Sequence, residues 1–324
     1  MKITHSTVLF LAMLLLSSCV HRGFDLDDGR FGYVEVVFDW RNAPEADPKS
    51  MVLFMYPREG GDPIRFDFAG RDGGRISIAP GVYDAVCVNS DRREVFYEDK
   101  NSFSTFLVTT DQLSNIPLSH NTFVRSAELP KAPGTEDQMI YDTPPMMWSS
   151  SEIGFDVTVD SGTRTKIQID HQVLTLYPKP IVDTYKVTVK NIKNVENIET
   201  LSGTLSDMSS GYLAGEQADT DNAVILPFGL TAYKENKRAE GTFLTFGHCP
   251  GERRSHSLVL YAVLSDDTKY YWVFDVSDQA HNPPDENGIH HIIVEFLDIP
   301  DLGGSSNIGA GVGDWSSSDI YIVL

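Results

Sequence analysis

The chain has 324 residues, of which 41% are hydrophobic and 10% aromatic, a composition that favours folded cores over disorder. Its length suggests two domains. Its formal net charge of −20 excludes nucleic acid as an expected partner, because an acidic surface repels phosphate backbones. Anionic lipid headgroups repel the same surface, so attachment to a membrane needs a separate anchor.

The first residues predict export and lipidation. Met1–Thr7 is a short, positively charged stretch, and Val8–Leu16 is a continuous apolar run. The run is far shorter than the roughly 20 apolar residues of a spanning helix, so residues 1–18 are expected to be a signal peptide. Ser17–Cys19 follows, and this end resembles the bacterial lipobox. The resemblance implies cleavage before Cys19, diacylation of its sulfur and acylation of the new amine, and two or more acyl chains anchor a protein stably. An ordinary cleavable signal with an incidental cysteine is the alternative.

Residues 19–31 are expected to be a lipidated tether. The run Asp25–Asp28 contains three acids, which is typical of a solvated spacer. Acids shortly after an acylated cysteine also resemble a surface-export signal of lipoproteins in Bacteroidales-type bacteria. The sequence leaves these two interpretations open, and it leaves open whether Arg22 or Arg30 is a processing site.

Beyond the tether, the apolar pattern is that of β-strands. From Tyr33 onward apolar and polar residues alternate with period 2. Met51–Tyr56 is apolar throughout, as expected for a strand buried on both faces. Turn signals roughly every 8–12 residues suggest a β-sandwich over residues 32–129. The expected strands of this half are Tyr33–Trp40, Met51–Tyr56, Arg65–Phe68, Arg75–Ala79, Val82–Val88, Phe103–Val108 and Asn121–Val124.

Residues 130–140 are expected to link this sandwich to a second one over residues 141–324. The apolar cluster Met146–Trp148 follows this linker, and we expect it to pack between the two sandwiches; a ligand platform is the alternative. A short helix is expected at Val195–Leu201, and the Ser- and Gly-rich segment Ser202–Gly215 is expected to be a loop. The expected strands are Phe155–Val159, Thr165–Ile169, Val173–Tyr177, Tyr185–Val189, Val224–Thr231, Thr242–Phe246, Leu258–Leu264, Tyr270–Val276, His290–Phe296 and Ile320–Val323.

The sequence lacks the common catalytic motifs, namely Gly-x-Ser-x-Gly, the P-loop and His-Glu-x-x-His. The glycine-rich run Gly303–Gly313 is followed by a strand, whereas a phosphate site needs a helix N-terminus. His290 and His291 are adjacent in an expected strand and point to opposite faces, so they are not expected to share a metal. Asp219–Asn222 is interpreted as a solvated turn, with a weak Ca²⁺ loop as the alternative. We therefore expect no catalytic residue, cofactor or metal, and no enzyme.

Two cysteines remain besides Cys19. Cys87 lies in a strand-like run and is interpreted as a small core residue. Cys249 lies in an expected loop beside His248, and no neighbouring partner for a Cys–His dyad is evident. An oxidising compartment would allow Cys87 and Cys249 to pair, although they fall in different halves of the chain. The sequence leaves this disulfide open, together with the oligomeric state.

Several motifs resemble known lipoproteins. The first half resembles an uncharacterised lipoprotein family of Bacteroidales through Phe38–Arg41, Tyr56–Pro57, Arg65–Phe68, Gly70–Gly74 and Pro80–Tyr83. The second half resembles the fimbrillin-class lipoproteins of the same bacteria through Leu176–Pro178, Tyr185–Val189, Leu201–Gly203 and Ser209–Tyr212. That class implies an all-β fold of two tandem transthyretin-like or Ig-like β-sandwiches. It also implies a role as a stalk, tip or anchor subunit of type V pili, whose subunits join by strand exchange.

The resemblance therefore implies a non-enzymatic lipoprotein, a pilus anchor or accessory subunit, held in the outer membrane by Cys19 and exposed on the cell surface. An unpaired sheet edge could accept a strand from another pilus subunit. The alternative is a surface glycan-binding lipoprotein of a polysaccharide-uptake system, which predicts a row of exposed aromatic side chains. The candidates for that row are Trp148, Tyr270, Tyr271, Trp272 and Trp315.

Overall fold

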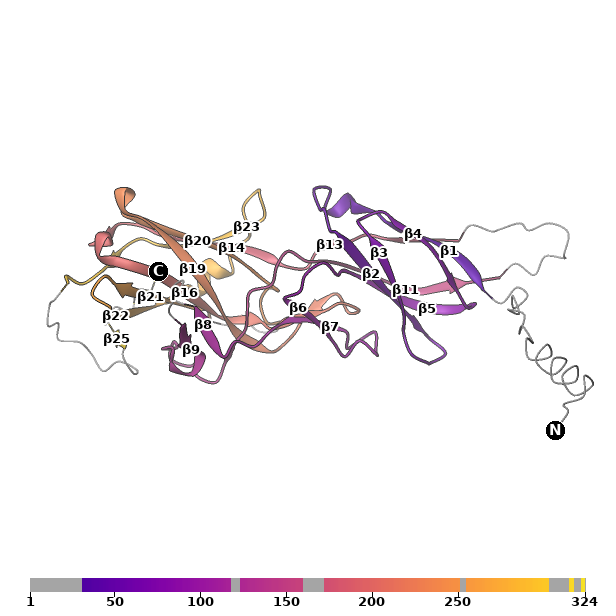
Figure 1. Cartoon of the computed structure of the whole chain (residues 1–324), viewed down its shortest axis with the longest axis horizontal. Coiled ribbons are helices and arrows are strands. Elements are labelled where there is room, and N and C mark those ends of the chain that lie inside the picture. The colour runs from indigo at the N-terminus through magenta and orange to yellow at the C-terminus, as the bar shows by residue number, and fades with distance from the viewer. Residues whose placement is uncertain are drawn as a thin grey trace, which may run out of the picture.

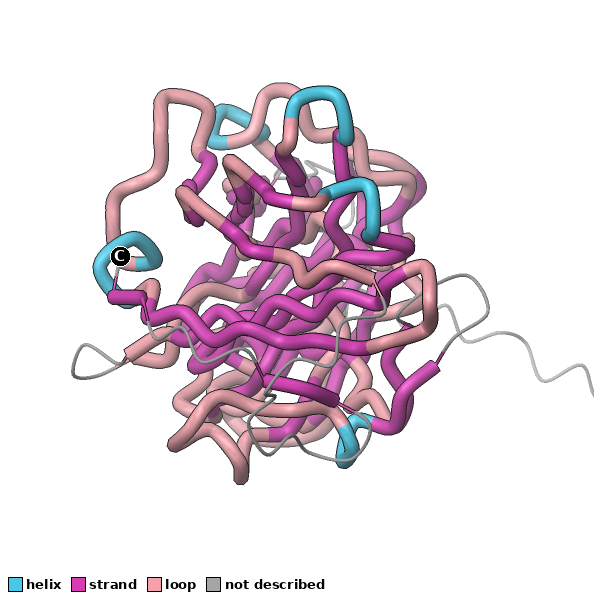
Figure 2. The backbone as a smooth tube through the Cα atoms, turned by 90° about the vertical axis from the view of Figure 1, so that its left-hand side faces the viewer, coloured by secondary structure: helices cyan, strands magenta, loops and turns pink. Residues whose placement is uncertain are grey.

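The structure is a computed structural model that describes residues 31–117, 123–159, 172–250, 255–302, 315–317 and 322–323. Most of its regular structure is β-strand, and Figure 2 shows the helices as short turns at the periphery. None of the helices in these ranges is long and apolar enough to cross a membrane. The predicted all-β class is confirmed. The helical elements are η1 (Trp40–Asn42), η2 (Ser126–Glu128), η3 (Val195–Asn197), η4 (Lys234–Asn236) and α2 (Ser277–Ala280).

Two sheets pack face to face at the right-hand end of Figure 1, and we call them the N-terminal sandwich. Side chains alternate between the two faces of the first strand, β1 (Gly32–Phe38), so Val34, Val36 and Phe38 all point into the core of this sandwich. There they pack in one cluster with Leu53 and Met55 of the facing sheet. The three-stranded sheet has the order β12 (Gln172–Leu176), β1 (Gly32–Phe38), β4 (Gly73–Ile78). The five-stranded sheet has the order β13 (Lys179–Pro180), β11 (Trp148–Val157), β5 (Gly81–Asn89), β2 (Ser50–Pro57), β3 (Ile64–Ala69).

Strand pairing in this sandwich differs from the expected division at residues 130–140. β11 and β12 lie after that segment in the sequence, yet β11 pairs antiparallel with β5, and β12 pairs parallel with β1. Trp148 and Leu174 consequently enter the same core as Val34. Period-2 alternation shows that a segment is a strand but does not show which sheet it joins, because the ladder is made by backbone groups that all residues share.

The five-stranded sheet is buried on both faces, as predicted from the apolar run in β2. Val52 and Phe54 point away from the first core and pack against Phe106 and Val108. Val108 belongs to, and Phe106 directly precedes, a strand of a four-stranded sheet that lies between the two ends of the molecule in Figure 1. Its order is β18 (Ala218–Asp219), β17 (Gly211–Leu213), β7 (Leu107–Thr110), β6 (Val95–Glu98), so it combines segments about a hundred residues apart.

A ten-stranded sheet, counted over the described residues, folds over itself to form what we call the C-terminal sandwich. β19 pairs with β16 along most of its length and with β20 at its end. β19 therefore belongs to both layers of this sandwich, the one that contains β16 and the one that contains β20. The order is β23 (Ile289–Val294), β14 (Asp183–Val189), β20 (Arg238–Thr245), β19 (Ala223–Tyr233), β16 (Ile198–Ser209), β21 (Ser257–Leu264), β22 (Lys269–Asp275), β25 (Trp315–Ser317). Off this path, β10 (Met139–Ile140) pairs with β19 and β26 (Ile322–Val323) with β22.

Two further two-stranded ladders complete the described structure. They are β8 (Asn115–Pro117) with β9 (Phe123–Arg125), and β15 (Ile192–Lys193) with β24 (Leu297–Asp298).

Two predictions of local structure were wrong. The helix expected at Val195–Leu201 is only the single turn η3, and β16 begins at Ile198. The segment Ser202–Gly215, expected to be a loop, forms most of β16 and all of β17. Its small residues have a packing reason, because a Cβ on Gly203 would lie 2.7 Å from Cζ of Phe228. Glycine here makes room for a ring from the neighbouring strand, and bonding to β19 and β21 holds the polar segment extended.

Candidate functional site

The predicted anchor lies outside the described part of the chain. Cys19, Arg22 and Arg30 all fall within residues 1–30. The expected strand Thr165–Ile169 and the glycine-rich loop Gly303–Gly313 also lie outside the described residues. Lipidation at Cys19 therefore stays a prediction, and the structure bears on the part of the protein that contacts partners.

The aromatic residues named for a glycan site do not form an exposed row. Trp148 and Trp315 are 8% and 4% exposed, and Tyr270 and Trp272 are also buried. Tyr271 is half-buried and packs against a hydrophobic cluster that contains Tyr261 and Trp315. These side chains stabilise the cores and are not available as a flat sugar-binding surface.

The Met146–Trp148 cluster, which was expected between the two sandwiches, packs between neighbouring sheets. Met147 is fully buried between the five-stranded and four-stranded sheets, and Trp148 points into the core of the N-terminal sandwich. Met146 contacts both cores. The cluster thus joins two layers and is not an open ligand platform.

Cys87 and Cys249 do not form a disulfide with each other. Cys87 lies in the core of the N-terminal sandwich, where burial raises the pKa of its thiol to about 12. Cys249 follows β20, and its Sγ donates to the Met208 carbonyl oxygen at 3.5 Å. The two buried thiols therefore have different surroundings.

The outer edge of the ten-stranded sheet is covered by two short strands from the C-terminal part of the chain. β25 pairs with Lys269–Tyr271 of β22, and β26 pairs with Phe274–Asp275. Both pairings are parallel, whereas β21 on the other side of β22 pairs antiparallel over seven residues. Parallel pairing is slightly less stable per residue than antiparallel pairing, so the described residues of β25 and β26 pair less strongly, residue for residue, with β22 than β21 does.

Trp315 holds β25 against a hydrophobic surface beside the β22 edge. Its ring centroid lies 5.4 Å from that of Tyr261 in an edge-to-face arrangement, and Lys269 Nζ lies 5.9 Å from the Trp315 ring. The buried members of this cluster are Ile116, Val124, Leu129, Ala132, Ile140, Ile225, Val259, Tyr261 and Trp315. A sheet edge beside a hydrophobic cluster is the arrangement that strand addition uses once the edge is free.

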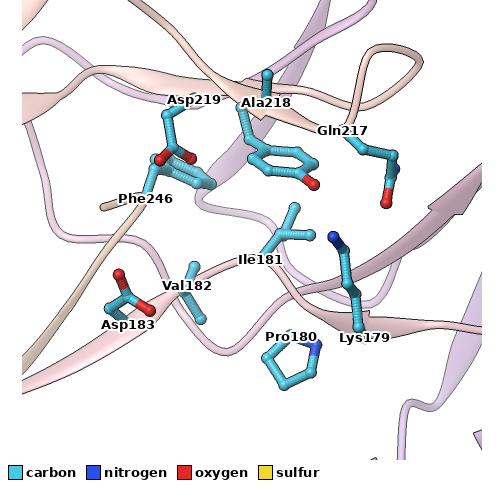
Figure 3. A pocket seen from close by; sticks show the side chains of 10 residues that line it. Lys179, Pro180, Ile181, Val182, Asp183, Gln217, Ala218, Asp219 and Phe246 are labelled. Atoms are coloured by element: carbon cyan, nitrogen blue, oxygen red, sulfur yellow. The ribbon is translucent and has the colours of Figure 1, made fainter. Parts of the chain in front are cut away.

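A pocket of about 190 Å³ lies where the chain passes from β13 to β14. Its walls come from this connection, from the β17–β18 hairpin and from Phe246, which follows β20. In Figure 3, Lys179 and Gln217 lie on one side of the pocket, and Asp183 and Asp219 lie on the other. The pocket therefore separates a cationic side from an acidic side.

The acidic side has unusual protonation. Burial, together with the nearby negative charge of Asp183, raises the pKa of Asp219 to about 7. Burial also raises the pKa of Asp183, and the charge of His290 opposes this shift. A Cβ on Gly247 would lie 2.7 Å from Asp219 Oδ2 and 3.5 Å from Asp183 Oδ2, so both carboxylates approach the same backbone position. The pocket consequently changes charge near neutral pH.

The structure also brings together three histidines that are distant in the sequence. His248 follows β20, His256 precedes β21 and His281 follows α2. Their ring centroids are 4.7 to 4.8 Å apart, and one nitrogen of each ring lies within 4.8 Å of the other two. Sequence reasoning considered His248 only with Cys249 and missed this group, because the spacing of the three histidines matches none of the common ligand motifs.

The adjacent histidines of β23 are not part of this group. His290 stacks on Tyr185 with centroids 4.7 Å apart, and its Nδ1 lies 3.0 Å from the Asn282 carbonyl oxygen. His291 Nε2 lies 3.0 Å from Asp285 Oδ2 at the surface. The two side chains thus have separate surroundings.

Comparison with known proteins gives the chain a family and a fold. Over 211 residues it is 23% identical to Fim4B, a candidate fimbrium-anchoring subunit of Bacteroides ovatus, and the match covers 64% of this chain. The match covers 55% of Fim4B, so the chain spans about half the length of that curated relative.

Two crystal structures share the fold. A candidate adhesin from Bacteroides ovatus superposes with a TM-score of 0.62 at 16% identity, covering 87% of this chain and 96% of the adhesin. A candidate polysaccharide-binding protein from Bacteroides thetaiotaomicron superposes with a TM-score of 0.50 at 12% identity, covering 82% of this chain and 92% of that protein. The model of a family described as a domain of unknown function, DUF5119, matches residues 18–229, and the chain belongs to that family.

Proposed function

We propose that this protein is a non-enzymatic cell-surface lipoprotein of the fimbrillin class that acts as a pilus anchor or accessory subunit. The similarity to Fim4B carries the proposal, because fimbrium anchoring is the role named for that relative. Acylation of Cys19 would supply the attachment to the outer membrane, since two or more acyl chains give stable anchoring where one chain gives only marginal binding.

The β22 edge is where a neighbouring pilus subunit would bind in this proposal. An antiparallel strand from another subunit could replace β25 and β26 and pair with β22 through main-chain hydrogen bonds. An apolar side chain of the incoming strand could occupy the position of Trp315 beside Tyr261. Main-chain bonding would supply affinity and the hydrophobic cluster would supply specificity.

The arrangement of the molecule suits an anchor. β1 begins toward the outer end of the N-terminal sandwich in Figure 1, whereas β22 lies in the C-terminal sandwich at the opposite end. A tether preceding β1 would therefore leave the β22 edge directed away from the membrane and accessible to pilus subunits.

The test is deletion of the gene in the native bacterium, followed by complementation with the wild type, Cys19→Ser or Ser18→Ala. We expect the deletion and Cys19→Ser to release pili into the medium, and Cys19→Ser to take up no labelled palmitate. Ser18→Ala is the matched control, because it keeps a small residue before the cysteine and should behave as the wild type. Unchanged pilus number, length and release in the deletion strain would refute the proposal.

The glycan-binding alternative has no supporting observation in the described residues. Its five candidate aromatic residues are buried or half-buried. The likeness to a candidate polysaccharide-binding protein is at 12% identity and concerns the fold alone. Specific binding of the purified protein on a glycan array would reinstate this alternative.

A further inference from the structure

Neighbouring groups determine where the ring protons of the histidine cluster lie. His256 Nδ1 is 2.8 Å from the carbonyl oxygen of Ser206. Because a carbonyl oxygen can only accept, His256 Nδ1 carries a proton, and Nε2 of the neutral ring presents a lone pair.

His248 is held in a complementary way. The Tyr185 hydroxyl donates its single proton to the Ala280 carbonyl oxygen at 3.0 Å, so it accepts from His248 Nε2, which is 3.0 Å away. With the Tyr185 proton on the Ala280 carbonyl oxygen, the proton of neutral His248 lies on Nε2, and Nδ1 presents a lone pair.

These assignments place two lone pairs face to face. His248 Nδ1 and His256 Nε2 are 3.1 Å apart, and lone pairs at that distance repel unless a cation lies between them. Neutral imidazoles with lone pairs directed at one point are what a metal ion requires.

The dimensions of the cluster fit a tetrahedral metal site. Zn–N bonds of about 2.0–2.1 Å place two ligand nitrogens about 3.3–3.4 Å apart, close to the 3.1 Å between His248 and His256. His281 supplies a third nitrogen within 4.8 Å of both. The Ser206 carbonyl and the Tyr185 hydroxyl contact the outer ring nitrogens, as hydrogen-bond partners of metal-bound histidines do.

We propose that His248, His256 and His281 bind one Zn²⁺ ion, with water in the fourth position. Imidazole ligands favour zinc and its neighbours in the transition series over calcium or magnesium. His248 follows β20, His256 directly precedes β21, and His281 follows α2. Bound zinc would therefore connect three chain segments and stabilise the folded state by mass action.

The site would lie at the end of the C-terminal sandwich that faces the N-terminal one. Thr245, which ends β20, pairs with Asp183 at the start of β14. Phe246 follows and packs in the same cluster as Phe54 of the five-stranded sheet. Zinc at His248 would thus stiffen the region through which the two sandwiches contact each other.

Metal binding is tested on the full-length protein, purified in detergent without a polyhistidine tag and dialysed against EDTA. Calorimetric titration with Zn²⁺ is expected to show one bound equivalent, and Co²⁺ is expected to produce the visible absorption of a four-coordinate site. His281→Gln is expected to lose this binding. His291→Gln is the matched control, because His291 is an exposed histidine bonded to Asp285, and it should bind as the wild type does.

Tyr185→Phe is a second variant that keeps the ring stacked on Phe243 and His290 and removes only the hydroxyl. Its affinity for Zn²⁺ is expected to fall by about 10–100-fold, the usual effect of losing a hydrogen-bond partner of a metal-bound histidine. Circular dichroism of the metal-free variants checks that they are folded. Wild-type protein that binds no Zn²⁺ at micromolar concentration, or His281→Gln that binds normally, would overturn the proposal. So would equal loss in His291→Gln.

Discussion

The ring of Trp148 packs edge-on against the ring of Trp40, with centroids 6.0 Å apart and an interplanar angle of 85°. Trp40 belongs to η1 near the start of the N-terminal sandwich, and Trp148 is the first residue of β11. Trp40 Nε1 also donates to the Arg71 carbonyl oxygen at 2.8 Å, which holds the ring in place. The contact joins two segments that are more than a hundred residues apart, and both rings are buried.

Truncation of Trp148 should destabilise the N-terminal sandwich. Trp148→Ala leaves a cavity beside Trp40 and is expected to lower the free energy of unfolding by about 3–5 kcal/mol, whereas Trp148→Phe should cost less. Urea denaturation monitored by fluorescence measures both. Phe296→Ala is the control, because Phe296 is 45% exposed and its loss should change stability by about 0.5 kcal/mol or less. An equal effect of the two alanine variants would contradict this account.

A methyl group at Gly203 should disturb the stacked rings of the C-terminal sandwich. Phe228 stacks on Phe243 with centroids 4.2 Å apart, and a Cβ on Gly203 would lie 2.7 Å from Cζ of Phe228. Gly203→Ala is expected to cost about 1–3 kcal/mol through overpacking. Thermal unfolding of Gly203→Ala and of Gly229→Ala provides the comparison. Gly229 lies beside Phe228 in β19 and has open space where a Cβ would be, so it should tolerate alanine.

The pocket carboxylate predicts a pH-dependent stability. The pKa of Asp219 is raised from 3.8 to about 7. Between these two pH values Asp219 is therefore protonated in the folded state and ionised in the unfolded chain. The free energy of unfolding contributed by this group therefore falls as pH rises from about 4 to about 7. Asp219→Asn stays neutral, so its stability should vary less over this range and exceed that of the wild type at pH 8.

Chemical denaturation at pH 4, 6 and 8 measures this difference. Asp67→Asn serves as the control, because Asp67 is a surface residue paired with Arg65. A wild-type profile that matches that of Asp219→Asn would show that the buried carboxylate does not contribute.

Loss of Trp315 should release the cover of the β22 edge. Trp315→Ala removes the ring packed on Tyr261, so β25 should detach more often and amide exchange in β22 should accelerate. Hydrogen exchange measured by mass spectrometry detects this change. β16 lies between two neighbours in the same sheet and is the internal control, since its exchange should stay unchanged. Equal protection of β22 in both proteins would mean that Trp315 does not hold the edge strand.

Long strands were predictable because their signal is local. The alternation in β1, the apolar run in β2 and the runs in β14, β21 and β22 all identified strands near their observed positions. The short strands β13, β17 and β18 contain two or three residues each, too few to show a period. β16 was mistaken for a helix and a loop because its serines and glycine suit a strand only when Phe228 packs over Gly203.

The candidate sites depended more strongly on tertiary structure. Cys19 was identified from its own neighbours, and that prediction needs no folded partner. The pocket combines residues from three separate segments, and Asp183 and Asp219 looked like ordinary polar residues in the sequence. The burial of Trp315 was equally hidden, because alternation does not distinguish a buried face from an exposed one.

By itself, the sequence determined that the protein is all-β and where most of its strands lie, since side-chain alternation acts between neighbours along the chain. Only the tertiary structure decided that β11 pairs with β5, that β12 pairs with β1, and that His248, His256 and His281 meet. The physical reason is that backbone hydrogen-bonding groups are alike in nearly every residue. The partner of each strand is therefore selected by how whole cores pack, which involves residues far apart in the sequence.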